Sequence, residues 1–199
     1  AYVNRGIAKD LLKDDKGAIE DYSKAIELDP DYAFSYVNRG LSKENLKDYK
    51  GAIEDYTKAI ELDPDYAFAY VNRGLSKENL KDYKGAIEDY TKAIELDPVD
   101  DYAYVNRGLS KENLKDYKGA IEDYTKAIEL DPVDDYAYVN RGNAKKTLKD
   151  DYGAIEDYSK AIELDPDYAD AYYNRGIAKG DLKDYYGAIE DYSKAIELK

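Results

Sequence analysis

The sequence predicts an all-α protein built from six tandem pairs of antiparallel helices. A period of 34 residues runs through the whole chain, and apolar residues recur at helical spacing in each half of the period. A proline also stands near every junction between periods, where it can end one helix and start the next. We therefore expect one continuous repeat array, residues 1–199, instead of two globular domains.

The period is carried by near-identical copies of one segment. The block YVNRGLSKENLKDYKGAIEDYTKAIELDP occurs unchanged at 36–64, 70–98 and 104–132, and weaker copies occupy 1–30, 138–166 and 172–199. The predicted units are 1–32, 33–66, 67–100, 101–134, 135–168 and 169–199. Natural expansion and deliberate construction both account for such exact copies.

The first half of each unit predicts a helix, seen most clearly at 33–46. Phe34, Val37 and Leu41 recur there at helical spacing. Residues 47–49 then form a short connection. Asp48 is the predicted N-cap of the next helix, because its carboxylate can accept from an unpaired backbone N–H.

The second half predicts a helix that packs back on the first. Ala52, Tyr56 and Ala59 fall on one stripe of this helix. Small residues such as Gly40 and Ala59 allow close approach between helices, and Tyr36 and Tyr56 are expected to fill the space between them. One hairpin cannot bury its own stripe, whereas stacked hairpins bury each other's.

These features resemble the tetratricopeptide repeat family over the full length of the chain. The matching residues of the second unit are Tyr36, Gly40, Ala52, Tyr56, Ala59 and Pro64. The resemblance implies a right-handed superhelical solenoid. The chain departs from the family pattern at Lys43, Lys77 and Lys111, where the family usually has an aromatic residue and where we expect only the lysine stem to pack.

Composition excludes several classes of partner. The net charge of −14 repels phosphate backbones, so nucleic acids and anionic membranes are not expected partners. The expected partners are neutral or basic peptides. No apolar stretch is long enough to span a bilayer and no secretion signal is visible, which predicts a cytoplasmic protein.

No enzymatic chemistry is predicted. The chain has no histidine and no cysteine, and carboxylate pairs such as Glu54 and Asp55 recur in every unit, unlike a catalytic site. Aspartate-rich turns, at 97–101 and 131–135, suggest either calcium binding or helix capping, and capping explains them better because the EF-hand spacing is missing. We therefore expect no cofactor and no metal.

Asparagine occupies one fixed place in every unit, on the first helix. In the family this side of the first helix lines a concave groove. In several members a row of asparagines in that groove holds the backbone of an extended peptide. An asparagine amide suits this role because it can donate to a backbone carbonyl and accept from a backbone N–H at the same time. The resemblance therefore implies a peptide-binding groove whose candidate residues are Asn38, Asn72, Asn106, Asn140 and Asn174, with Val37, Val71, Val105, Leu41, Leu75, Leu109, Phe34, Phe68, Tyr102 and Tyr136. The alternative is that these asparagines only satisfy local backbone groups.

The sequence thus predicts a protein-interaction scaffold that binds an extended peptide or a partner helix. The groove positions lack the lysines with which some family members clamp a terminal carboxylate, so an internal or basic peptide fits better. The alternative is a structural or engineered scaffold with no dedicated ligand. An apolar face at the last helix predicts head-to-tail self-association, unless the segment was cut from a longer array.

Overall fold

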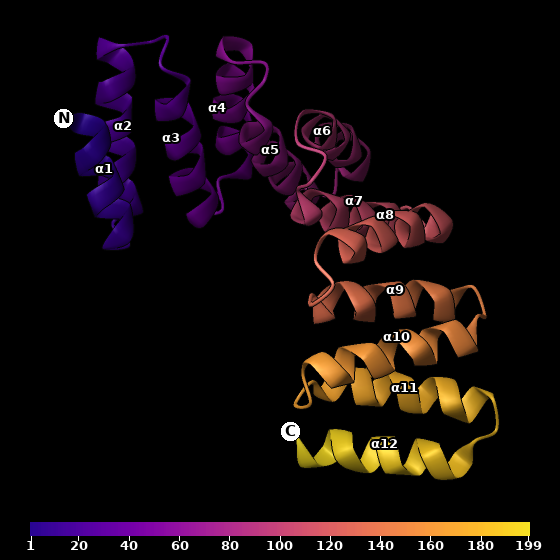
Figure 1. Ribbon diagram of the computed structural model, residues 1–199. Coiled ribbons are helices and arrows are strands. Elements are labelled where there is room, and N and C mark those ends of the chain that lie inside the picture. Colours follow the sequence, from indigo (N-terminus) through magenta and orange to yellow (C-terminus); the bar gives the residue numbers. More distant parts are fainter. The chain divides into compact units, whose positions relative to one another are not determined.

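The computed structural model describes residues 1–199 and is entirely helical, which confirms the predicted all-α class (Figure 1). The chain forms two compact units of six helices each, Ala1–Pro98 and Val99–Lys199. The first unit contains α1 (Tyr2–Leu11), α2 (Asp15–Leu28), α3 (Ala33–Asn45), α4 (Tyr49–Leu62), α5 (Ala67–Asn79) and α6 (Tyr83–Leu96). The second contains α7 (Asp101–Asn113), α8 (Tyr117–Leu130), α9 (Asp135–Thr147), α10 (Asp151–Leu164), α11 (Ala169–Asp181) and α12 (Tyr185–Glu197).

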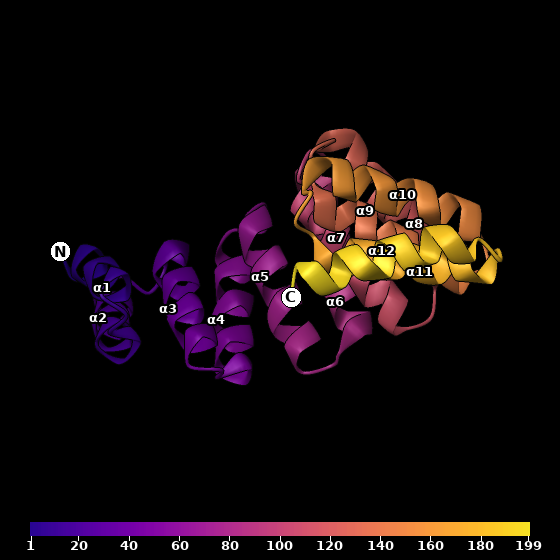
Figure 2. The same cartoon turned by 90° about the horizontal axis from the view of Figure 1, so that it is seen from below.

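The helices pair as hairpins, as the sequence predicts. Within each unit every helix packs against the next one along the chain, and the first helices of neighbouring hairpins also touch. The partners α11 and α12 lie side by side in two perpendicular views (Figure 2). None of the helices combines the length and the apolar character needed to cross a bilayer.

The core of each hairpin is a tyrosine packed against a glycine. Tyr56 on α4 is fully buried, and a Cβ built on Gly40 of α3 would lie only 2.7 Å from its Cε1 atom. Ala52 and Ala59 are also fully buried, which confirms the predicted stripe on α4. The same glycine–tyrosine contact recurs in every hairpin, so the helices can approach closely only because these glycines lack a side chain.

The turn inside each hairpin combines an aspartate cap with a lysine in left-handed backbone conformation. Asp48 accepts from the backbone N–H of Gly51 at 3.1 Å, which confirms the predicted N-cap. Lys47 has a φ of 62°, and its N–H donates to the carbonyl of Glu44 at 2.7 Å. This is the chain reversal that glycine usually makes after a helix, adopted here by a lysine in all six hairpins.

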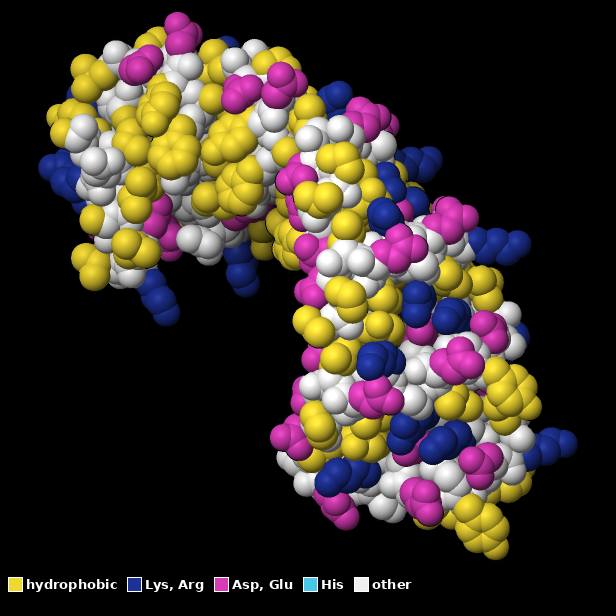
Figure 3. Space-filling view, in the orientation of Figure 1, with side chains coloured by type: hydrophobic (Ala, Val, Ile, Leu, Met, Phe, Trp, Pro, Cys, Tyr) yellow, Lys and Arg dark blue, Asp and Glu magenta, His cyan; other side chains and the backbone are white.

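The visible surface of the two units differs in chemistry. On the face shown in Figure 3, apolar side chains gather over α1–α4, whereas acidic and basic side chains interleave over α9–α12.

Candidate functional site

The predicted asparagines lie on the first helices of the hairpins, and most are tied to their own helix. Asn72, Asn106 and Asn140 are 6–8% exposed. Each donates its Nδ2 to the carbonyl four residues earlier, at 2.6, 2.7 and 2.9 Å respectively. Asn38 does the same to Phe34 at 2.6 Å. One amide hydrogen of each of these side chains therefore bonds to the local backbone, as expected if the asparagines satisfy local backbone groups.

The remaining amide groups of these asparagines are not used inside the protein. The side-chain oxygens of Asn38, Asn72, Asn106 and Asn140 accept no hydrogen bond from the chain, and none of these oxygens is both buried and unpaired. Each side chain thus keeps one acceptor and one N–H for an external group. Asn174 differs, because it donates to Asn143 Oδ1 at 3.2 Å.

Exposed aromatic rings accompany the asparagines on the same helix face. Phe34, Phe68, Tyr102 and Tyr136 stand four residues before the asparagines and are 36–52% exposed. The equivalent position of the last hairpin is Asp170. The aromatic rings are thus accessible for an apolar partner on α3 and α5 in the first unit and on α7 and α9 in the second.

The structure separates the predicted valines from the predicted leucines. Val37, Val71 and Val105 are 1–5% exposed and form part of the core. The three leucines are half-buried and border the same helix face: Leu41, Leu75 and Leu109. The valines therefore support this face from below. The aromatic residues are its exposed part, the leucines are half-buried, and Asn72, Asn106 and Asn140 lie almost as deep as the valines.

We call this surface the aromatic–asparagine surface. It consists of Phe34, Asn38, Leu41, Phe68, Asn72 and Leu75 in the first unit, and of Tyr102, Asn106, Leu109, Tyr136 and Asn140 in the second. Each of the four hairpins that begin with α3, α5, α7 and α9 contributes one aromatic residue and one asparagine to it. Neighbouring first helices touch within each unit, so these contributions lie next to one another there.

A buried ion network lies between the two helices of each hairpin, and sequence reasoning did not find it. Asp55 on α4 is 3% exposed and receives Arg39 Nε at 2.9 Å and Arg39 Nη2 at 2.6 Å. Lys43 Nζ lies 2.7 Å from Asp55 Oδ2 and donates to the carbonyl of Gly51 at 3.2 Å. The expectation that only the stem of Lys43 packs was therefore incomplete, because its ammonium group pairs with a buried carboxylate.

The same network recurs in all six hairpins. An arginine pairs with the aspartate 16 residues later and a lysine pairs with the aspartate 12 residues later. That constant spacing between opposite charges was the available signal. In the last hairpin, burial opposes ionisation of Asp191, yet hydrogen bonds from Arg175 and Lys179 leave its pKa below the usual range. All members are internally paired, so this network stabilises the hairpin and offers no open site.

A second, partly buried carboxylate joins neighbouring hairpins. Glu44 on α3 accepts from the hydroxyl of Tyr56 at 2.8 Å and, through its other oxygen, from the hydroxyl of Ser76 in the next hairpin. Burial raises the pKa of Glu44, and these two hydrogen bonds offset part of the rise. The tyrosine hydroxyl thus has the polar partner that a buried tyrosine requires.

The aspartate-rich turns serve as helix caps. Asp100 accepts from the N–H of Ala103 and Asp134 accepts from the N–H of Ala137, both at 3.2 Å, at the starts of α7 and α9. No group of three or more acidic side chains has an arrangement that could hold a metal ion. Capping therefore accounts for these aspartates.

Comparisons with known proteins agree with the repeat geometry. A family model described as tetratricopeptide repeat matches residues 1–32, 33–66, 67–100, 102–134 and 169–199, and a model described as TPR repeat matches 150–183. A search of curated proteins found no match.

Solved structures show the same arrangement of helices. MamA is 28% identical over 80% of this chain and 93% of its own, with a TM-score of 0.78. YrrB, described as a TPR protein with an unusual peptide-binding site, is 27% identical over 89% of this chain and 92% of its own, also with a TM-score of 0.78. Pseudomonas aeruginosa pilF is 19% identical over 100% of this chain and 96% of its own, with a TM-score of 0.81, and supports the fold alone.

Proposed function

Because the chain belongs to the tetratricopeptide repeat family, we propose that it is a protein-interaction scaffold that binds an extended peptide on the aromatic–asparagine surface. One repeated feature of the first helices supports this most. An exposed aromatic ring stands next to an asparagine whose side-chain amide keeps an unused acceptor and an unused donor. Proteins of this family are generally scaffolds without enzymatic activity, and we propose no catalytic role for this chain.

The chemistry of the surface defines the kind of peptide. An amide oxygen and an N–H can pair with the N–H and carbonyl of an extended backbone whatever its side chains are, and the neighbouring rings favour apolar side chains at intervals. The net charge of −14 favours neutral or basic sequences. The peptide-binding site described for YrrB, whose structure is similar to this chain, supports a peptide as the ligand.

The valines of the sequence prediction are not part of the proposed contact. Val37, Val71 and Val105 are buried, so we propose that they act indirectly by fixing the first helices in place. The contact residues are those of the aromatic–asparagine surface.

The proposal is tested by selecting peptides from a random library and measuring their affinity by fluorescence anisotropy. Phe68→Asp and Tyr136→Asp each introduce the residue type that the last hairpin has at the equivalent position, Asp170. Both rings are about half exposed, so the variants should still fold. We expect each change to weaken binding by about tenfold, since losing one well-packed aromatic contact costs about 1–2 kcal/mol.

A matched control is Tyr152→Lys on α10. Tyr152 is 73% exposed, lies outside the proposed surface, and stands where other hairpins have lysine, as at Lys118. Its affinity should equal that of the parent. If the selection enriches no peptide, or if the enriched peptides bind all variants equally, the chain is better explained as a scaffold without a dedicated ligand.

A further inference from the structure

Exposed aromatic rings gather where α3 and α5 begin. The ring centres of Tyr32 and Phe34 are 5.9 Å apart, and Tyr32 and Phe34 are both exposed. The ring centres of Tyr66 and Phe68 are 6.3 Å apart, and Phe68 is 50% exposed. The two pairs are neighbours, because α3 touches α5. Burial raises the pKa of Tyr66, and the nearby Asp63 and Tyr32 raise it further. We call the two tyrosines and two phenylalanines the ring cluster.

The ring cluster lies where the near-identical hairpins differ in sequence. The three exact copies of the repeat are preceded by short junctions that read DYAFS at 31–35, DYAFA at 65–69 and VDDYA at 99–103, and VDDYA occurs again at 133–137. In place of Tyr32 and Tyr66, the second unit has Asp100 and Asp134, which cap α7 and α9. A pair of rings therefore stands at the start of α3 and of α5, whereas α7 and α9 each start with a single ring.

The charge along the segments that carry the ring cluster is only negative. Residues 29–38 and 63–72 contain four aspartates and no lysine or arginine. These aspartates are exposed: Asp29, Asp31, Asp63 and Asp65. The N–H of Asp65 donates to Asp63 Oδ1 at 3.2 Å, which holds both residues on one turn just before Tyr66. A cationic side chain can use both the rings and the carboxylates, whereas an apolar one can use only the rings.

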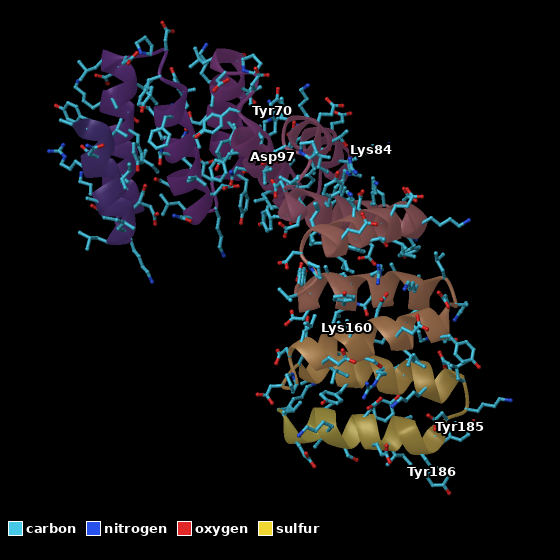
Figure 4. The ribbon with its side chains drawn as sticks, viewed as in Figure 1. Tyr70, Lys84, Asp97, Lys160, Tyr185 and Tyr186 are labelled. Atoms are coloured by element: carbon cyan, nitrogen blue, oxygen red, sulfur yellow. The ribbon has the colours of Figure 1, made fainter.

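The chain already shows which cation suits this combination of groups. The Arg73 guanidinium lies 5.5 Å from the ring centre of Tyr70, which Figure 4 labels on α5, and donates to both carboxylate oxygens of Asp89 at 2.6 and 3.0 Å. An arginine lies over a tyrosine ring in the same way in all six hairpins. A planar guanidinium can stack on an aromatic face and donate to a carboxylate at the same time. The ring cluster offers these same two kinds of partner on the surface.

We propose that the ring cluster binds an arginine side chain of the partner peptide, with the guanidinium between the rings and the carboxylates of Asp31 and Asp65. This inference rests on the proposed function and deepens it, because Phe34 and Phe68 belong to the aromatic–asparagine surface. The first unit thereby fixes the place of one arginine in the bound peptide.

Fluorine NMR can observe the ring cluster by itself. Phe34 and Phe68 are the only phenylalanines of the chain, so incorporated 4-fluorophenylalanine reports from this cluster alone. The protein is titrated with Nα-acetylarginine amide, with its neutral isostere Nα-acetylcitrulline amide and with Nα-acetylleucine amide. We expect saturable shifts with the arginine amide and about fivefold weaker binding of the other two. Added salt should weaken only the arginine interaction, because it screens the exposed carboxylates.

Asp65→Val tests the contribution of the carboxylates. The second unit has Val99 and Val133 at this position, so the turn accepts the change. We expect affinity for the arginine amide to fall about threefold and affinity for the leucine amide to stay the same or rise. Asp167→Val is the matched control, because the N–H of Asp167 donates to Asp165 Oδ1 at 2.9 Å in the equivalent turn before α11. It removes the same charge where no phenylalanine follows, so it should leave the titration unchanged.

The arginine inference is overturned if the arginine amide does not shift the fluorine signals, or if the citrulline or leucine amide binds as tightly. It is also overturned if Asp65→Val has no effect, or if Asp167→Val weakens binding equally. Circular dichroism should show the same helix content for both variants. The peptide selection separates this inference from the proposed function. Enriched peptides that bind while the arginine amide does not would refute only the arginine site, and an arginine response without any enriched peptide would refute only peptide binding.

Discussion

Replacing Gly40 by alanine tests the close contact between the two helices of a hairpin. In an unconstrained helix this change stabilises by about 1 kcal/mol, because alanine is the better helix former. Here the new Cβ would lie 2.7 Å from Tyr56 Cε1 and 2.9 Å from Tyr56 Cζ, well inside ordinary contact distance. Tyr56 is fully buried and its hydroxyl is held by Glu44, so the ring cannot move away freely.

The magnitude follows from three opposing effects. Overpacking a close-packed core costs about 1–3 kcal/mol, and weakening the bond from Tyr56 to Glu44 costs about 0.5–1.5 kcal/mol. The gain in helix propensity offsets about 1 kcal/mol of this. We therefore expect Gly40→Ala to destabilise the protein by about 2 kcal/mol.

Urea unfolding followed by far-ultraviolet circular dichroism measures the effect. Midpoints should be compared together with slopes, because repeat arrays need not unfold in a single step. Gly180→Ala on α11 is the matched control: its Cβ meets nothing within 4 Å, so it should stabilise by up to about 1 kcal/mol. If Gly40→Ala raised the midpoint as Gly180→Ala does, the account of the glycine–tyrosine contact would be refuted.

Three further changes test the other interactions of a hairpin. Asp55→Ala should destabilise by about 3–5 kcal/mol, because it leaves Arg39 and Lys43 partly buried without their carboxylate, and a urea midpoint close to that of the parent would contradict this. Lys47→Gly should stabilise by about 0.5–1 kcal/mol, since glycine adopts a φ of 62° without a Cβ penalty, and a lower midpoint would show that the lysine side chain makes a contribution that outweighs this strain. Glu44→Gln should make stability less dependent on pH. Burial raises the pKa of Glu44, so the folded state binds a proton more tightly than the unfolded chain does. Glu44 therefore favours folding less as the pH rises from the ordinary glutamate pKa through the raised value. Urea midpoints measured across that interval should fall less with rising pH in the variant than in the parent.

Features that depend on local pattern could be predicted from the sequence. The period of 34 residues, the cap at Asp48 and the buried stripe of Ala52, Tyr56 and Ala59 all follow from spacing along a helix, and the structure confirms them. The sequence also predicts that Gly40 and Tyr56 lie where helices meet, whereas the pairing of these two residues is found only in the structure.

What the sequence did not show depends on geometry across the hairpin. The pairing of Lys43 with Asp55 crosses a turn, so helical periodicity on either helix does not show it. Val37 and Asn38 are adjacent and differ by about 100° around the helix, which is too small a difference to decide from sequence which of them lies deeper. The bond from Asn72 to the carbonyl of Phe68 needs only a helix and a suitable rotamer, so both interpretations of the asparagines fit the same sequence.

The most direct test of the proposed binding surface is a solution NMR titration with selective ¹⁵N labelling of asparagine side chains, using a peptide enriched by the parent protein. A peptide bound to the first unit should shift the side-chain amide of Asn72, and one bound to the second unit those of Asn106 and Asn140, because each of these amides keeps one N–H and one oxygen for a ligand. Asn79 and Asn113 serve as internal references, because they donate to the carbonyls of Leu75 and Leu109 near the ends of their helices and lie outside the proposed surface. If the peptide binds while the first three amides stay unchanged, or while only the references shift, binding takes place elsewhere and the proposal is contradicted.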